Sequence, residues 1–389
     1  MEEKEEKPQN LDYNNYSFVE GKYLRRGYTT GTCAAAAAKA AATMLFSGDT
    51  VSQVVIKTPK GPILTLDVEN IEILPDKISC AVKKDGGDDP DITNGLYIYA
   101  MLSKTITGIE ITGGEGIGLV TKPGLDQPVG AYAINTVPRK CIAEACAGVC
   151  DKYGYTGGLR VQISAPGGKQ LAKRTFNPRL GIVGGLSILG TSGIVEPMST
   201  NAVVDTIRAE LNMLYSLGKR DILLTVGNYG EAFAHNRLGL SMAANVKCSN
   251  FIGETLNIAA EKGFKRVLLI GHLGKLVKLS LGITNTHSSN GDGRLEAIVM
   301  CALKSGADLS LLHKLSECVN TDGAFDILKE NNLLNKTMDL ISSRIDDTLK
   351  RHTSDHLEVG FICFSGTGEN AEICAKNALA DNMREVFYE

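Results

Sequence analysis

Short apolar runs alternate with helical segments throughout the second half of this 389-residue chain. Asp221–Val226, Arg266–Ile270 and Leu357–Phe364 are typical of buried strands, whereas 250–262 and 295–305 have helical periodicity. This alternation predicts strand–helix–strand units and a largely parallel sheet. Because ligands of such sheets gather beyond the carboxyl ends of the strands, the loops there are the first place to expect a site.

The first half has a different character, with more turns and fewer helices. Val54–Ile56 and Ile63–Leu66 flank a Pro- and Gly-containing turn and predict a hairpin. Cys33–Phe46 is almost entirely alanine and predicts a closely packed helix, with Thr32 as its N-cap. A further helix is expected to close the chain from Asn370. The fold class predicted for the whole chain is α/β: an α+β domain followed by an α/β domain with a mostly parallel, Rossmann-like sheet.

The change of character falls at the glycine-punctuated stretch Gly181–Met198, which we interpret as a junction near a site. Residues 1–20 are charged and lack periodicity, which indicates a mobile tail. The predicted domains are an N-terminal domain over 21–195 and a C-terminal domain over 196–389.

Composition excludes several classes of protein. A net charge of −3 gives no basic field for nucleic acid. No apolar run approaches the roughly 20 residues that cross a bilayer. The ten cysteines include no CxxC pair, and no secretory segment precedes them, so we expect reduced thiols in the cytoplasm and no zinc site. The aspartates of 85–91 lack EF-hand spacing, so turns and caps explain them better than a cation site.

Two glycine motifs of the second half can be tested against known patterns. Gly274-Lys275 is not a P-loop, because the preceding glycine spacing and the following Ser or Thr are missing. Gly227-Asn228-Tyr229-Gly230 lacks the third glycine of the dinucleotide fingerprint, and Tyr229 fills the space that a pyrophosphate needs. A nucleotide-like ligand without a pyrophosphate, such as S-adenosylmethionine, is compatible with this turn.

In the first half, a glycine-rich turn and basic side chains are compatible with an anionic ligand. Gly113–Gly118 is followed by Lys122 and Arg139, and Arg25 and Arg26 precede the alanine helix. Backbone N–H groups and cations of this kind can bind a polyanion. A series of tight β-turns with exposed basic side chains explains the same residues without a ligand.

Six motifs in this order resemble the cobalt-precorrin-5B C1-methyltransferase family of anaerobic cobalamin biosynthesis, from about Arg25 to Glu296. They are Gly27–Ala34, Asp91–Gly95, Gly113–Arg139, Gly185–Ser199, Ser249–Gly253, and Gly271–Lys275 with Thr286–Ser288. The resemblance implies transfer of a methyl group from S-adenosyl-L-methionine to C1 of a cobalt-containing tetrapyrrole. It places the cobalt in the substrate and requires no protein-bound metal.

Candidate residues follow for each part of this reaction. The methyl donor is expected in the C-terminal domain, with contacts from Gly227, Asn228, Gly230, Asn250 and Gly271. The carboxylates of the tetrapyrrole are expected mainly at the N-terminal domain, with contacts from Arg25, Arg26, Thr29, Thr30, Lys122, Arg139 and Thr191. The candidates for moving a proton on the macrocycle are Glu196, His272 and His287.

Two other functions stay open at this point. One is a nicotinamide-dependent reductase of the same pathway, which the missing dinucleotide fingerprint disfavours. The other is a carrier that shelters the tetrapyrrole without chemistry. As partners we expect the tetrapyrrole substrate, no nucleic acid and no membrane, and we leave a homo-oligomer open.

Overall fold

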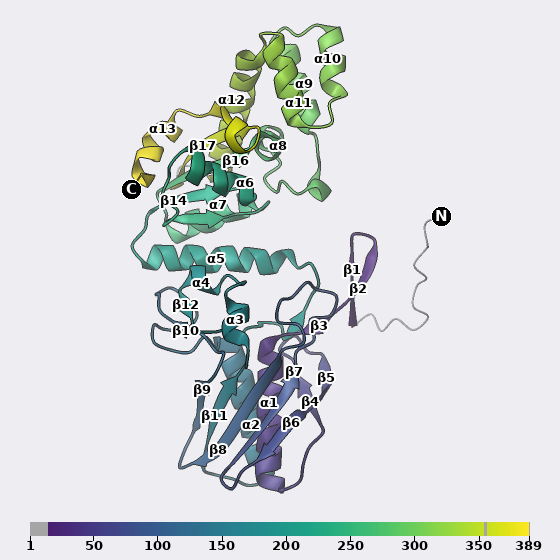
Figure 1. Cartoon of the computed structure of the whole chain (residues 1–389), viewed down its shortest axis with the longest axis vertical. Helices are drawn as coiled ribbons and strands as arrows, with labels where there is room; N and C mark the ends of the chain where they lie inside the picture. The colour runs from purple at the N-terminus through teal and green to yellow at the C-terminus, as the bar shows by residue number, and fades with distance from the viewer. Residues whose placement is uncertain (1–14, 354–355, 389) are drawn as a thin grey trace, which may run out of the picture. The chain divides into compact units, whose positions relative to one another are not determined.

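The computed structural model describes residues 15–353 and 356–388, which form two compact units that divide between Thr200 and Asn201 (Figure 1). The first fourteen residues of the predicted tail lie outside the described chain. Its last part was predicted wrongly, because β1 (Tyr16–Val19) pairs with β2 (Lys22–Arg25). The rings of Phe18 and Tyr23 are 4.9 Å apart across this hairpin, and Gly21 adopts the positive φ that its turn requires.

The N-terminal unit is built on a mixed five-stranded sheet in the order β6-β7-β8-β11-β9. Neighbouring strands are antiparallel except for β9 and β11. Helices α1 and α2 pack side by side, α1 against β7 and β8 and α2 against β9 (Figure 1). The predicted hairpin is confirmed as β4 and β5. The bounds are α1 Thr30–Ser47, β4 Gln53–Lys57, β5 Ile63–Asp67, β6 Glu69–Ile73, β7 Lys77–Lys83, β8 Tyr97–Thr105, β9 Ile109–Gly113, α2 Thr136–Lys152 and β11 Gly158–Ser164.

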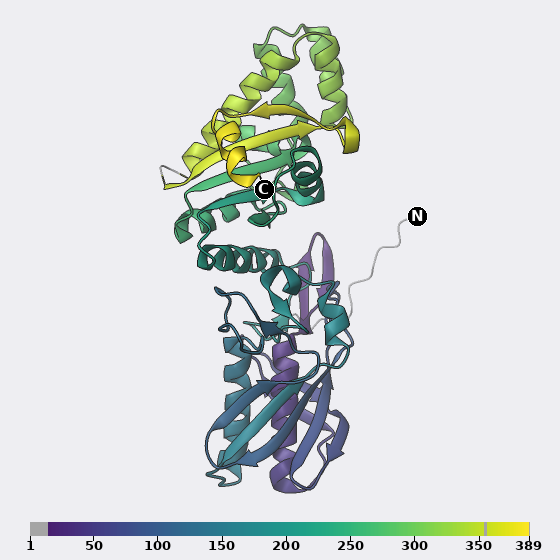
Figure 2. The ribbon, with the colours of Figure 1, turned by 60° about the vertical axis from the view of Figure 1, so that its left-hand side comes forward.

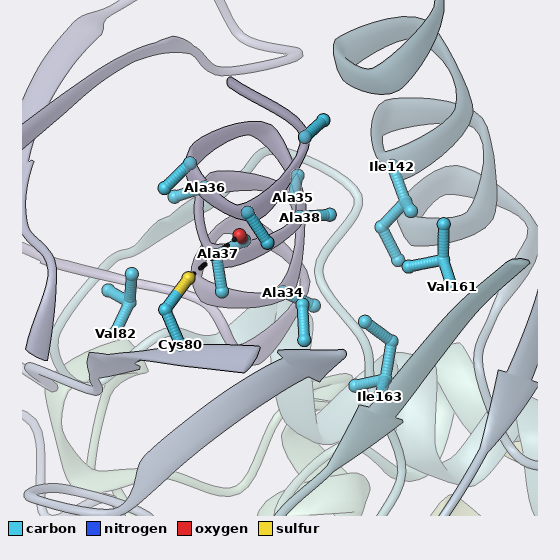
Figure 3. Close-up of a cluster of buried hydrophobic side chains, with 14 of the residues drawn as sticks. Ala34, Ala35, Ala36, Ala37, Ala38, Cys80, Val82, Ile142, Val161 and Ile163 are labelled. Carbon is cyan, nitrogen blue, oxygen red and sulfur yellow. Dashed lines mark hydrogen bonds between the residues drawn. The ribbon is translucent and has the colours of Figure 1, made fainter. Parts of the chain in front are cut away.

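The alanine helix is the centre of this unit's core, as its composition predicts. Its alanines are at most 1% exposed, and Figure 3 shows them surrounded by side chains of β7, β11 and α2. Methyl side chains let neighbouring elements approach the helix closely, so that Cys80 of β7 donates to the Ala37 carbonyl over 3.2 Å. The predicted N-cap was wrong: α1 is capped by Thr29, whose hydroxyl accepts from the Thr32 amide at 3.2 Å, because Thr29 has the extended backbone of a cap.

The glycine-punctuated stretch 181–198 lies within the N-terminal unit, and the division between the units follows it. Its β12 (Ile182–Val183) pairs with β10 (Leu119–Val120), and its β13 (Ile194–Val195) pairs with β3 (Gly27–Tyr28). A Cβ on Gly185 would lie 2.2 Å from the Gly116 carbonyl oxygen. Glycine is required there because one part of the backbone crosses directly over another.

The C-terminal unit contains a five-stranded sheet in the order β15-β14-β16-β17-β18, and its first four strands are parallel. The predicted α/β class and the parallel pairing of the strands at Ile222 and Val267 are confirmed. A helix does lie near the end of the described chain, but its predicted start at Asn370 was wrong: β18 runs antiparallel to β17 first, and α13 begins at Leu379. The bounds are β14 Asp221–Thr225, β15 Asn245–Lys247, β16 Arg266–His272, β17 Glu358–Ser365 and β18 Glu372–Lys376.

Helices complete this unit around the sheet (Figure 2). The long α12 packs against α7 and α9, and α10 and α11 pack against α9. The segments between β16 and β17 therefore form a helical cluster beside the sheet. The bounds are α5 Thr200–Ser216, α6 Gly227–Ala232, α7 Ile252–Lys262, α8 Leu273–Leu276, η3 Val277–Leu281, α9 Arg294–Lys304, α10 Leu309–Ser316, α11 Thr321–Glu330, α12 Leu334–Thr353 and α13 Leu379–Arg384.

Candidate active site

The two arginines before α1 have partners within the N-terminal unit. Arg25 binds the Asp85 carboxylate with both terminal nitrogens, at 2.6 and 2.8 Å. This contact raises the pKa of Arg25 and lowers the pKa of Asp85. Arg26 donates from Nε to the Ser17 hydroxyl at 3.0 Å. The bidentate face of Arg25 is thus already occupied by the protein's own carboxylate.

Arg139 and Lys122, the pair predicted to hold substrate carboxylates, contact backbone carbonyls. The Arg139 guanidinium donates to Ile134, Ile111 and Tyr132, over 2.8, 3.0 and 3.4 Å. Its burial lowers the pKa of this guanidinium. Lys122 donates to the Arg179 carbonyl at 3.2 Å. These contacts tie together the loops around the glycine-rich turn, and their role toward a substrate stays a prediction.

The three threonines predicted to contact substrate differ in exposure. Thr29 is buried as the cap of α1, and Thr30 is buried where its hydroxyl accepts from the Leu189 amide at 3.0 Å. Thr191 is exposed. Of the three side chains, only Thr191 lies where a ligand could reach it without rearrangement.

Glu196, the predicted proton carrier of this unit, forms an ion pair with Lys60 at 2.7 Å. The hydrogen bond from Lys60 lowers the pKa of the Glu196 carboxyl. A carboxylate stabilised in its charged form is a weaker base, which reduces its suitability for accepting a proton.

The predicted methyl-donor turn lies at a topological switch point of the C-terminal sheet. The chain leaves β14 toward β15 on one side, and α7 returns it to β16 on the other side. Ligands of open α/β sheets bind where the connections diverge in this way, at the carboxyl ends of the two strands. Gly227 and Asn228 follow β14 at this point, and Gly271 lies in β16.

The glycines of the switch point have different roles. Gly227 has φ +69° with open space where a side chain would be. Gly230 is buried, and a Cβ there would lie 2.8 Å from the Ile270 carbonyl oxygen. A Cβ on Gly271 would lie 3.0 Å from the Leu276 side chain. Gly230 and Gly271 therefore allow close packing of the backbone at the switch point.

Asn250 joins three motifs that are far apart in the sequence. Its side-chain oxygen accepts from Lys275 Nζ at 2.9 Å and from the Thr286 hydroxyl at 3.2 Å. The motifs Ser249–Gly253, Gly271–Lys275 and Thr286–Ser288 thus meet beyond the carboxyl end of β16. Lys275 was missed as a site residue because its neighbourhood is formed by segments that sequence reading cannot place together.

The two predicted histidines of this unit have different surroundings. His272 caps α8: its Nδ1 accepts from the Gly274 amide at 3.1 Å, and its Nε2 lies 3.3 Å from Asp322 Oδ1. Because Nδ1 accepts a hydrogen bond, the proton of the neutral ring is on Nε2. The Nε2–H group makes no hydrogen bond of good geometry, so its contact with Asp322 is electrostatic. His287 Nδ1 contacts the Ser289 hydroxyl at 2.7 Å. Within the described chain, no hydrogen bond involves His287 Nε2, which is therefore the ring nitrogen free to exchange a proton.

Residues 15–353 and 356–388 contain neither a metal-binding cluster nor a membrane-spanning helix. No group of three or more His, Cys, Asp or Glu side chains in that part could hold a metal ion. None of its helices combines the length and apolar character needed to span a membrane.

Two family models match this chain. The model described as CbiD matches residues 17–197, and the model of the CbiD C-terminal domain matches 285–372. A Ruminiclostridium cellulolyticum protein named cobalt-precorrin-5B C(1)-methyltransferase is 48% identical over 85% of each chain. A Clostridioides difficile protein of the same name is 38% identical over 96% of this chain and 99% of its own. The chain belongs to the CbiD family.

The comparisons confirm the family resemblance carried by the motifs and extend it beyond Glu296, where the match by motifs ends. Among solved structures, the cobalamin biosynthesis protein cbiD from Archaeoglobus fulgidus is 29% identical. That match covers 67% of this chain and 81% of the other, with a TM-score of 0.38. The roles of individual residues remain predictions within the family.

Proposed function

We propose that this protein methylates C1 of cobalt-precorrin-5B to give cobalt-precorrin-6A in cobalamin biosynthesis, with S-adenosyl-L-methionine as methyl donor. The observation that carries the proposal is 48% identity over 85% of the chain to a protein named for this activity. Family models at both ends of the chain support it further. Neither the nicotinamide-dependent reductase nor the carrier is favoured by these relatives.

Positioning is the main task of such an enzyme. The methyl carbon leaves a sulfonium as the C–S bond breaks and a bond to C1 forms, so the leaving thioether needs no proton. Alignment of donor and acceptor can supply roughly 7–11 kcal/mol of the barrier reduction. No nucleophilic side chain is required, in agreement with the buried Cys33, whose pKa is raised to about 12 by burial.

We place the methyl donor at the switch point, beside Gly227 and Asn228. The strand order supports this assignment, as do the open space at Gly227 and the exposed side chain of Asn228. Of the three proposed proton carriers, His287 is the best supported, because the ring nitrogens of His272 face Gly274 and Asp322 and Glu196 pairs with Lys60.

The experiment is a methyl-transfer assay with purified protein, cobalt-precorrin-5B and isotopically labelled S-adenosylmethionine. We expect label in the tetrapyrrole at C1 and release of S-adenosylhomocysteine. Binding of a nicotinamide cofactor without methyl transfer would favour the reductase, and binding of tetrapyrrole alone would favour the carrier.

The methyl-donor site is tested separately with Asn228→Ala. We expect weaker S-adenosylmethionine binding in calorimetry and an unchanged fold, because Asn228 is exposed and its side-chain oxygen accepts from Lys247 at 2.9 Å, its one hydrogen bond among the described residues. Asn331→Ala is the matched control, since Asn331 is also exposed and its side chain donates to the Ile327 carbonyl. Equal affinities in the two variants would move the donor site elsewhere.

A further inference from the structure

Three cations gather around the loop that joins η3 to α9. Lys278 is 3% exposed and donates to the carbonyls of Thr286 and Gly291, at 3.3 and 2.8 Å. Its ammonium therefore fixes both ends of the 286–291 segment. Lys275 approaches from α8 and Arg294 from the first turn of α9.

The carboxylates near these cations do not balance their charge. Asp292 binds Arg294 through Nε and Nη2, at 2.5 and 2.7 Å, and lies 3.9 Å from Lys278 Nζ. Glu296 acts on Arg294 from a greater distance. Within the described chain, no ion pair reaches Lys275, and Nη1 of Arg294 stays unused by Asp292.

Lys275 has the most unfavourable environment of the three. It is half-buried, and within the described chain its ammonium donates to the neutral side-chain oxygen of Asn250. Burial and the charges of Lys278 and Arg294 lower the pKa of Lys275, while Asp292 opposes them. An anion placed beside Lys275 would offset both the cost of desolvating its ammonium and the repulsion by the neighbouring cations.

A hollow adjoins this cluster within the C-terminal unit. Its volume is about 280 Å³, and its walls include Asp292, Arg294, Glu296 and Val299 on one side and Ser316, Asn320 and Thr321 of the α10–α11 segment on the other. Arg294 joins the hollow to the cluster, whereas Lys275 lies outside its walls. This size is at the lower end of small-molecule pockets, which span roughly 300–1,000 Å³. The hollow therefore accommodates a short aliphatic arm and not a tetrapyrrole ring.

We propose that Lys275, Arg294 and this hollow form a binding site for one aliphatic carboxylate arm. The inference rests on the proposed function, in which the arm is a carboxylate side chain of the tetrapyrrole. Arg294 Nη1 and the Lys275 ammonium bind the carboxylate, and the Val299 wall contacts its methylene groups. The amino-acid tail of S-adenosylmethionine carries the same chemistry, so the experiment must separate the two sources.

The test measures binding by Lys275→Met and Arg294→Gln, which remove charge with little loss of volume. The probes are cobyrinic acid, with free side-chain carboxylates, its heptamethyl ester, and S-adenosylmethionine. We expect both variants to bind cobyrinic acid at least about tenfold more weakly than wild type. Affinity for the ester and for S-adenosylmethionine should stay within about twofold. Lys275→Arg, which keeps the charge, should retain most of the affinity for cobyrinic acid.

Lys304→Met is the matched control, because Lys304 is an exposed cation at the opposite end of α9. Thermal unfolding of every variant checks the fold. Unchanged cobyrinic acid affinity in folded Lys275→Met and Arg294→Gln would overturn the proposal, as would a wild type that binds acid and ester equally. A selective loss of S-adenosylmethionine affinity would also overturn it and assign the cluster to the donor. Failure of wild type in the methyl-transfer assay contradicts the proposed function independently of these binding results.

Discussion

Arg25 and Arg139 of the N-terminal unit bind the protein's own carboxylate and carbonyls, whereas Lys275 of the C-terminal unit donates to a neutral amide beside two other cations and has no ion pair within the described chain. Arg25 is paired with a carboxylate, and Arg139 donates to three backbone carbonyls, so both side chains hold loops of the N-terminal unit together. The third retains an electrostatic imbalance that a ligand can relieve. The environment of a cation thus separates a structural role from a binding role better than its place in a motif does.

Lys84 is a buried cation of the N-terminal unit: its side chain is 1% exposed and forms an ion pair with Asp91 at 2.8 Å. Asp91→Asn would leave the buried ammonium without a counter-charge. We expect the free energy of unfolding to fall by about 3–5 kcal/mol, measured by urea denaturation.

Adding Lys84→Met to that variant should recover part of the loss, because an apolar side chain carries no desolvation penalty. If Asp91→Asn is as stable as wild type, the pair does not have the structural role that its burial indicates. The comparison between paired cations of the N-terminal unit and Lys275 of the C-terminal unit would then lose its basis.

Arg139 tests the prediction that basic residues of the N-terminal unit bind the carboxylates of the tetrapyrrole. Its three hydrogen bonds to carbonyls predict that Arg139→Gln lowers the free energy of unfolding by roughly 1.5–3 kcal/mol, the range for a hydrogen bond with a charged donor. Cobyrinic acid affinity should change less than it does in Lys275→Met.

Arg160→Gln is the control, since the Arg160–Glu110 pair is exposed and is expected to contribute about 0–1 kcal/mol. Reduced corrinoid affinity in a fully stable Arg139→Gln would restore Arg139 as a substrate contact. It would also show that contacts with carbonyls do not exclude a binding role.

Much of the fold follows from local pattern in the sequence, because periodicity and composition report burial directly. The parallel sheet and the alanine core helix are of this kind. The role of the glycine-rich stretch 181–198 cannot be predicted from local pattern. A glycine needed for a backbone crossing, such as Gly185, has the same sequence signature as one needed for a ligand.

The candidate site was predictable only in part for a related reason. Asn250 and the Gly271–Lys275 motif were found from sequence, and the structure brings them together. Asp292 and Arg294 are two residues apart and pair locally, whereas the nearness of both to Lys275 depends on how η3 and α9 pack. Charge balance at a site is a property of tertiary structure, so the sequence could not indicate which cation lacks a counter-charge.

The smallest predicted effect concerns His272, a group of the C-terminal unit that does have internal partners. Its Nδ1 accepts from the Gly274 amide, and its ring packs edge-on against Phe364 with centroids 5.3 Å apart. Burial lowers the pKa of His272 below its ordinary value, and Asp322 only partly opposes this shift. Protonation would also place an N–H at Nδ1, facing the Gly274 N–H that it now accepts from.

The direction of the pH effect follows from this lowered pKa. In the unfolded chain the imidazole takes up a proton near pH 6.5, whereas in the folded chain it does so only at lower pH. The free energy of unfolding should therefore fall as the pH drops from about 6.5 to the folded pKa of His272. His272→Asn keeps a side chain that can cap α8 but does not titrate, so its stability should depend less on pH in that window. Denaturation of wild type and His272→Asn between pH 7.5 and pH 5 measures the difference between their pH dependences. The contributions of the other histidines are common to both proteins and cancel. Equal slopes would mean that His272 is not held neutral by the fold, and it would again be a candidate for moving a proton during methyl transfer.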